Sequence, residues 1–91
     1  MKIPIIIFNK IKIVKALINK NARIDILDEN NRSILYNVIK YSYLDILKLL
    51  IEKDKETIGG TILEIADNEG NIPLFYAIKF YNFEAVKIII N

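Results

Sequence analysis

Residues 21–51, NARIDILDENNRSILYNVIKYSYLDILKLLI, decide the fold because the chain repeats them as residues 60–90, GTILEIADNEGNIPLFYAIKFYNFEAVKIII. The two segments align without a gap at an offset of 39 residues. A shorter copy precedes them, since IVKALI at 13–18 matches ILKLLI at 46–51 at an offset of 33 residues. Self-similarity at such a period is the signature of a solenoid, in which each unit buries its apolar side against its neighbours.

Each long copy contains two short segments with the apolar spacing of a helix. The segments 33–41 and 43 onward both place apolar residues at i, i+3 and i+4 positions. Helices this short are not stable alone in water, so paired helices must stack on the next pair. The residues expected to pack inward are Leu35, Val38, Ile39, Ile46, Leu47, Leu50, Ile51, Leu74, Ala77 and Ile78.

The residues before each inner helix are typical of turns and helix starts. Asp28 and Asp67 are expected to open β-turns by accepting hydrogen bonds from backbone N–H groups. Ser33 precedes an apolar helical segment and can cap it. Pro73 suits the first position of a helix, where its missing N–H has no partner to lose.

This arrangement resembles the ankyrin repeat, whose general pattern is D-x-x-G-x-T-P-L-H-x-A-A, then a helical I-V-x-L-L, then G-A-D-V-N. The first copy carries Ile13-Val14 and ends in Asn21-Ala22, where the family has Gly-Ala. The other matches are Asp28, Ser33, Leu35, Ile46 and Leu47 in the second copy, and Asp67, Gly70, Pro73, Leu74, Ala77 and Val86 in the third.

The resemblance implies an all-α ankyrin-repeat solenoid of about three repeats, built from stacked helix-turn-helix pairs with β-turn or hairpin connections. We expect residues 1–91 to form a single domain. A partial first repeat covers 1–27, the second covers 28–66 with six extra residues, and a partial third covers 67–91.

The six extra residues lie in EKDKETIGG, residues 52–60. Because Glu, Lys and Asp are acceptable in helices and Ile58 follows Ile51 by seven positions, the second outer helix is expected to run on to about Ile58. Gly59-Gly60 would then end it. An irregular loop is the alternative.

Several positions depart from the ankyrin pattern. The third copy has Ile72 in place of the capping Thr and Phe75 in place of His, so their hydrogen bonds cannot form there. Burial of Phe75 would offset the lost cap. The Gly usual between the helices is replaced by Asn9, Ser42 and Tyr81. A left-handed Tyr costs about 1–2 kcal/mol, so either this strain is present or the turn is reshaped.

Composition excludes several kinds of chemistry. The chain has 91 residues, no Cys and no His, which removes disulfides, Cys- or His-ligated metals and His-based nucleophile systems. Net charge is only +2 and the basic residues are scattered, which disfavours nucleic-acid binding. The apolar run 3–8 is too short to span a membrane. We therefore expect a soluble, non-enzymatic protein without cofactors, and AT-rich codon usage explains its abundant Ile, Lys and Asn. The resemblance to ankyrin proteins implies an intracellular, cytoplasmic location, which the lack of Cys permits.

Acidic residues near the turns raise the possibility of a metal site. Asp25, Asp28 and Glu29 form one group and Asp67 with Glu69 a second. The spacing of Asp67-Asn68-Glu69-Gly70 places its Gly too early for an EF-hand, so a role in the turns is favoured. The triplet 31–33 matches a glycosylation site, but Ser33 is interpreted as a cap.

The resemblance also indicates a partner-binding surface, because the turn tips and the inner-helix ends face the concave groove of ankyrin proteins. Phe8, Tyr41 and Phe80 occupy equivalent positions and could either bind a partner or pack between repeats. Aromatic rings beside lysines would suit a partner with apolar anchors and some acidic character. The candidates are Glu29, Asn30, Arg32, Lys40 and Tyr41 in the second copy, and Asn68, Glu69, Asn71, Lys79 and Phe80 in the third.

The expected function is protein–protein interaction with a partner of unknown identity, through this groove and the turn tips. A structural spacer within a larger multidomain protein is the alternative. The chain begins inside a repeat and ends directly after Ile88-Ile89-Ile90, so we expect it to be a segment of a longer protein. Exposed apolar edges at both terminal repeats could otherwise lead to self-association.

Overall fold

The computed structural model describes residues 12–13, 15–16, 20, 24–56 and 61–91. The regular elements are α2 (Leu35–Lys40), α3 (Leu44–Glu56), the short 3₁₀ helix η1 (Ile62–Glu64), α4 (Pro73–Lys79) and α5 (Phe83–Ile90). The described parts of the first copy, 12–13 and 15–16, are also helical. These residues contain no strand, and the all-α prediction is confirmed.

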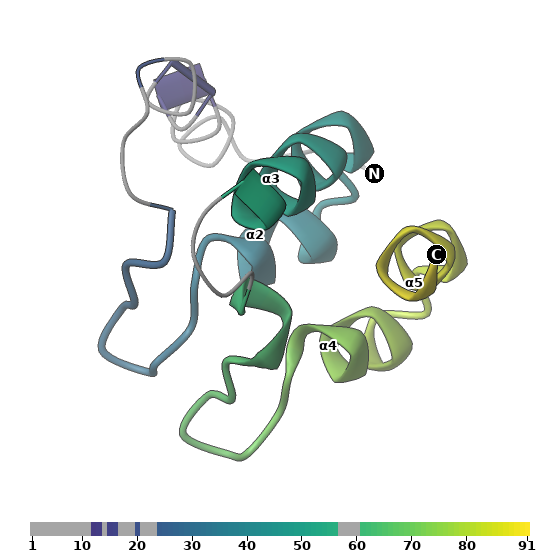
Figure 1. The fold of residues 1–91 in the computed structure, drawn as a ribbon. Coiled ribbons are helices and arrows are strands. Elements are labelled where there is room, and N and C mark those ends of the chain that lie inside the picture. The colour runs from purple at the N-terminus through teal and green to yellow at the C-terminus, as the bar shows by residue number, and fades with distance from the viewer. Residues whose placement is uncertain (1–11, 14, 17–19, 21–23, 57–60) are drawn as a thin grey trace.

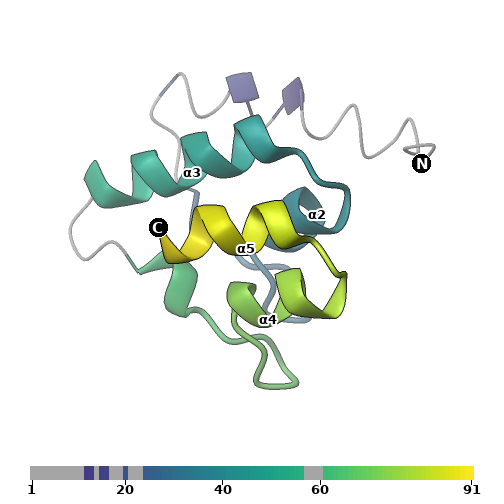
Figure 2. The ribbon, with the colours of Figure 1, turned by 90° about the vertical axis from the view of Figure 1, so that its right-hand side faces the viewer.

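The helices form two layers, each built from one helix of each repeat. Inner helices α2 and α4 contact one another, α3 packs on α2, α5 packs on α4, and the outer helices α3 and α5 also touch. Figure 2 shows α3 and α5 lying side by side. The apolar core between the layers consists of Leu35, Val38, Ile39, Ile46, Leu47, Leu50, Ile51, Ile62, Tyr76, Ala77 and Ala85.

The two turns before the inner helices have the same hydrogen-bond pattern. Asp28 Oδ1 accepts from the N–H groups of Asn30 (2.8 Å) and Arg32 (3.0 Å). Asp67 Oδ1 accepts from those of Glu69 (2.9 Å) and Asn71 (2.9 Å). The predicted role of both aspartates in β-turns is confirmed. In Figure 1 the turns project together from one side of the helices.

The predicted helix starts are also observed. Ser33 Oγ accepts a hydrogen bond of 3.2 Å from the N–H of Leu35, the first residue of α2. Pro73 opens α4, and Ile72 before it provides no side-chain cap. The departure from the capping Thr of the ankyrin pattern therefore leaves α4 without a side-chain cap, as expected.

Helix α3 continues through much of the extra segment, as predicted. Its described part, Leu44–Glu56, has 13 residues against eight in α5. The predicted end near Ile58 and the stop at Gly59-Gly60 lie outside the described residues. Asp54, in the last turns of α3, is buried, and both of its carboxylate oxygens lie 3.2 Å from the N–H of Ile62. The extension is thus attached to η1, which precedes the turn of the third repeat.

Two expectations about α4 are wrong. Ile78 was expected to pack inward, but its exposed fraction is 55%. Phe75 was expected to compensate for the missing cap by burial, but it is 49% exposed. The residue that α4 buries against α2 is Tyr76, whose ring packs edge-on against Tyr36 at 5.1 Å. Ile78 and Phe75 lie on the α4 surface that no further described helix covers.

The connections between inner and outer helices are left-handed at equivalent positions. Ser42 has φ 58° and Tyr81 has φ 55°. The turn keeps its usual shape, because Tyr81 N–H donates to Ile78 O (3.0 Å) just as Ser42 N–H donates to Ile39 O (3.2 Å). The chain therefore accepts a strained Tyr at this position rather than a reshaped turn.

Replacing Tyr81 with glycine should raise the free energy of unfolding by about 0.5–1 kcal/mol. Relief of the left-handed strain, about 1–2 kcal/mol, exceeds the greater backbone entropy of unfolded Gly. Loss of the ring removes little packing because Tyr81 is 81% exposed. Urea titration measures the change. Tyr81→Ala is the control, since it removes the ring but keeps the strain, and an equal gain in that variant would show that strain is not the cause.

Candidate protein-binding surface

Hydrogen bonds between the two turns hold their tips side by side. Asn31 Nδ2 donates to Asn68 Oδ1 at 2.7 Å. The N–H of Asn68 donates to Asn30 O at 3.0 Å, and Asn68 Nδ2 donates to Glu29 O at 3.3 Å. The positive φ angles of Asn31 (59°) and Gly70 (81°) give both turns the same shape. The tips form one surface rather than two independent loops.

A small polar hollow lies at the two turns. It has a volume of about 160 Å³ and is lined by Asn30, Arg32, Asp67, Asn68 and Glu69. At its base Arg32 Nε donates to Asp67 Oδ2 at 3.4 Å, and the Asp67 side chain is only 2% exposed. This contact joins the second repeat to the turn of the third.

Hydrogen bonding lowers the pKa of Asp67 below its ordinary value of 3.8. The Asn71 N–H is the largest cause, and the Glu69 N–H and the Arg32 side chain act in the same direction against the effect of burial. Burial and then the Asp67 charge raise the pKa of Tyr76 to about 12, so this phenol stays neutral.

The charge of Asp67 should make stability fall in acid. The pKa of Asp67 is lower in the folded protein than in the unfolded chain. Its contribution to the free energy of unfolding is therefore complete above a pH of about 4 and is lost as the pH falls through the folded pKa. Urea unfolding from pH 5 to pH 2 measures this decline. Asp67→Asn keeps an acceptor for the turn but does not ionise, so it should be less stable at neutral pH and show a shallower decline. Equal slopes for the two proteins would contradict the assignment.

Aromatic rings from both repeats meet next to this hollow. The Tyr36 ring lies edge-on to Tyr76 (centroids 5.1 Å apart, 83°) and to Phe80 (5.6 Å, 72°). The guanidinium carbon of Arg32 lies over the Tyr36 ring, 4.0 Å from the ring centroid. Such contacts contribute about 0.5–1.5 kcal/mol each, and they hold Tyr36 in one orientation.

Two exposed lysines mark the far ends of the inner helices. Lys40 Nζ lies 5.6 Å from the Tyr41 ring centroid and 6.0 Å from that of Tyr36. Lys79 ends α4 at the equivalent position. Neither ammonium group has an acidic partner among residues 24–56 and 61–91.

The structure brings most of the candidates onto one side of the molecule. Glu29, Asn30, Asn68 and Glu69 are exposed at the tips, and Arg32 and Asn71 are half-buried beneath them. Lys40 and Lys79 are exposed, whereas Tyr41 and Phe80 are half-buried. Phe80 packs on Tyr36 and therefore contributes to contact between repeats, and Phe8 lies outside the described residues.

Sequence reasoning missed three members of this surface: Tyr36 and Tyr76 as its aromatic centre, and Asp67 as its anchor. The spacing of Arg32, Tyr36 and Lys40 at i, i+4 and i+8 could have indicated a stripe along α2. No sequence pattern pointed to Tyr76, because the equivalent residue of the second copy is Asn37.

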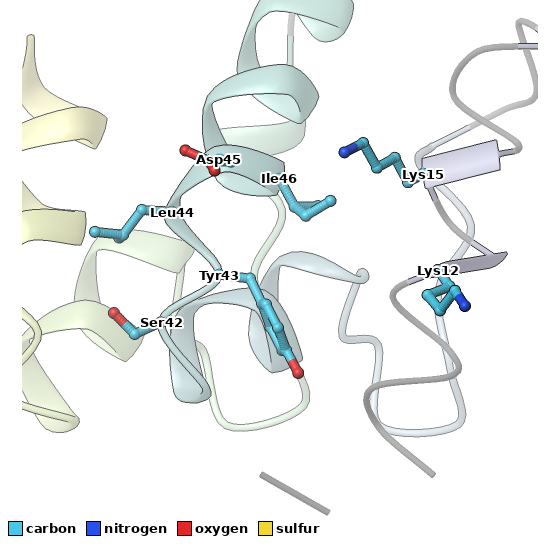
Figure 3. A pocket seen from close by; sticks show the side chains of 7 residues that line it. All are labelled: Lys12, Lys15, Ser42, Tyr43, Leu44, Asp45 and Ile46. Carbon is cyan, nitrogen blue, oxygen red and sulfur yellow. The ribbon is translucent and has the colours of Figure 1, made fainter. Parts of the chain in front are cut away.

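Among the described residues, two further hollows lie away from this surface. The larger, about 420 Å³, separates the helical residues of the first copy from the start of α3 (Figure 3) and is lined by Lys12, Lys15, Ser42, Tyr43, Leu44, Asp45 and Ile46. In Figure 3 Lys15 extends toward α3 while Asp45 points away. The other, about 370 Å³, is apolar and lies between α4 and α5, lined by Ala77, Ile78, Tyr81, Phe83 and Val86.

Metal-binding groups and membrane-spanning helices are absent from the described part of the chain. These residues contain no group of three or more His, Cys, Asp or Glu side chains placed to hold a metal ion. No helix among them is long and apolar enough to cross a membrane.

Paired helices stacked in two layers, with paired turns projecting from one edge, define a helical repeat protein. A family profile described as "Ankyrin repeats (3 copies)" matches residues 5–91, and the chain belongs to this family. It is similar to ankyrin repeat protein L371 of Acanthamoeba polyphaga mimivirus, with 42% identity over 82 residues. The alignment covers 90% of this chain and 11% of that relative, so the chain spans about a tenth of the relative's length.

Proposed function

We propose that this chain binds a partner protein through the concave side formed by the turn tips and the inner helices α2 and α4. Ankyrin repeats are generally protein-interaction modules, and the chain belongs to that family. The observation that carries the proposal is that exposed tip residues and exposed lysines converge on one rigid side. Hydrogen bonds between Asn68 and the opposite turn hold that side in place.

The proposed role is non-catalytic and intracellular, and it requires no cofactor, nucleic acid or membrane. Asp67 and Arg32 at the base of this side have structural roles, because Asp67 holds its turn and pairs with Arg32. Burial and the Asp67 charge keep the Tyr76 phenol neutral by raising its pKa to about 12. These contacts stabilise the surface.

Affinity capture with the chain as bait tests the proposal. Lys40→Ala with Lys79→Ala removes two exposed charges from the concave side, and Lys48→Ala with Lys55→Ala removes two from the outer helix α3. A captured partner should be lost from the first variant and retained by the second. Equal capture by all three proteins, or none, would contradict binding through this side and favour a spacer role.

Self-association is a second candidate, supported by the apolar hollow of about 370 Å³ between α4 and α5. Phe83 beside it is 72% exposed, and Ile90 at the end of α5 is 67% exposed. Sedimentation equilibrium over a range of concentrations tests this candidate. Dimerisation that Phe83→Asp abolishes would support it, and a monomer at all concentrations would exclude it.

A further inference from the structure

The charges of the concave side are separated along the inner helices, and the tips form the acidic end. Glu29 and Glu69 are exposed, and neither carboxylate has a cationic partner among the described residues. Hydrogen bonds from Asn68 to the opposite turn hold the two tips together. Among the described residues of the two turns the single cation, Arg32, already pairs with Asp67. The joined tips therefore present two exposed carboxylates to a partner.

The opposite end of the same side is basic. Lys40 and Lys79 end α2 and α4, with exposed side chains and no acidic partner among residues 24–56 and 61–91. The seven residues of α4 alone are about 10 Å long, and the turn adds to this distance. The acidic and basic ends therefore lie farther apart than the screening length of about 8 Å at physiological salt, and each acts separately on a bound chain.

Apolar surface lies between the two ends. Tyr36 is half-buried there and is held by Arg32 and Phe80. Aromatic side chains that are already held in one orientation lose little entropy when a partner side chain packs on them. The middle of the surface thus fits an aliphatic or aromatic anchor.

From this charge complementarity we infer that the concave side binds a linear peptide segment in one direction. A basic residue of the segment lies at the tips, an apolar residue lies against Tyr36, and an acidic residue lies at Lys40 and Lys79. At about 3.3 Å per residue, at least three extended residues are needed to cover the roughly 10 Å of α4, and the turn adds to this number. The inference rests on the proposed function and adds the chemistry and orientation of the partner.

Selection from a displayed library of random peptides, each about 12 residues long to exceed the span, tests the inference. The variant Glu29→Lys, Glu69→Lys, Lys40→Glu, Lys79→Glu reverses the polarity of the surface without altering net charge. A matched control, Lys48→Glu, Lys55→Glu, Glu52→Lys, Glu64→Lys, makes equally many reversals at exposed positions on α3 and η1. Circular dichroism confirms that each protein is folded.

Peptides selected on the native chain should share the order basic–apolar–acidic in one chain direction. Those selected on the reversed variant should have the opposite order. In low salt, peptides selected on the native chain should bind the reversed variant at least tenfold more weakly than they bind the native chain. They should bind the matched control as tightly as they bind the native chain. Peptides that bind the concave side without a charge order would overturn the inference while leaving the proposed function intact. No enrichment, or binding that the reversal leaves unchanged, would overturn both.

Discussion

Replacing Asp54 with alanine is expected to lower the free energy of unfolding by about 2–3 kcal/mol, although Asp54 lies on a helix in the extra segment. Its two carboxylate oxygens accept from the N–H of Ile62, which is itself only 1% exposed. Removing a charged acceptor leaves that buried donor without its partner, and such an unsatisfied group costs about 1–3 kcal/mol. Loss of the charged hydrogen bond also detaches the end of α3 from η1.

Urea titration of two further variants separates hydrogen bonding from the length of the side chain. Asp54→Asn keeps an acceptor for the N–H of Ile62, so its free energy of unfolding should fall by less than about 1 kcal/mol. Glu52→Ala, at an exposed position of the same helix, should change stability by no more than about 0.5 kcal/mol. If Asp54→Ala behaved like Glu52→Ala, the extension of α3 would contribute nothing to joining the repeats.

Replacing Asn82 with alanine is expected to lower the free energy of unfolding by about 2 kcal/mol. Asn82 Oδ1 caps α5 by accepting from the N–H of Ala85 at 3.1 Å. Its Nδ2 donates to Ile39 O, at the end of α2 in the preceding repeat, at 3.0 Å. Loss of a cap typically costs about 1 kcal/mol, and loss of a hydrogen bond between repeats costs a similar amount.

Asn82→Asp distinguishes the two roles, because it keeps the capping oxygen and removes the amide donor. Its free energy of unfolding should fall by about half as much as that of Asn82→Ala. The negative charge at the start of α5 is favourable, but repulsion between the new carboxylate and the carbonyl oxygen of Ile39 opposes it. Thermal unfolding measures the difference, since 1 kcal/mol shifts Tm by about 4–8 °C in a domain of this size. Native stability in Asn82→Asp would show that the bond to Ile39 is unimportant, and equal loss in both variants would exclude capping.

The repeat offset and the helical spacing made most of the fold predictable. They placed Leu35, Val38 and Ile39 in the core, because a short amphipathic helix has one way to bury its apolar face. They also assigned Asp28 and Asp67 to turns, because each side chain accepts hydrogen bonds from backbone N–H groups only a few residues further along the chain. The same reasoning was wrong for Ile78, because periodicity identifies a face but not whether another element covers it.

The binding surface was only partly accessible to the same reasoning. The tip residues and Lys40 and Lys79 could be assigned by their position in the repeat. The pairing of Arg32 with Asp67 across 35 residues could not, because it depends on how closely two turns approach. Tyr36 and Tyr76 meet for a similar reason, although they are not equivalent in the repeat.

Local interactions therefore account for the helices, the turns and the family to which the chain belongs, because they depend on residues a few positions apart. The contacts that join one repeat to the next depend on tertiary packing. Asp54, Asn82 and Asp67 each satisfy a group in another segment, and their local sequence is compatible with an exposed polar residue. Their burial and partners follow from the distance between stacked units, which short-range patterns do not encode.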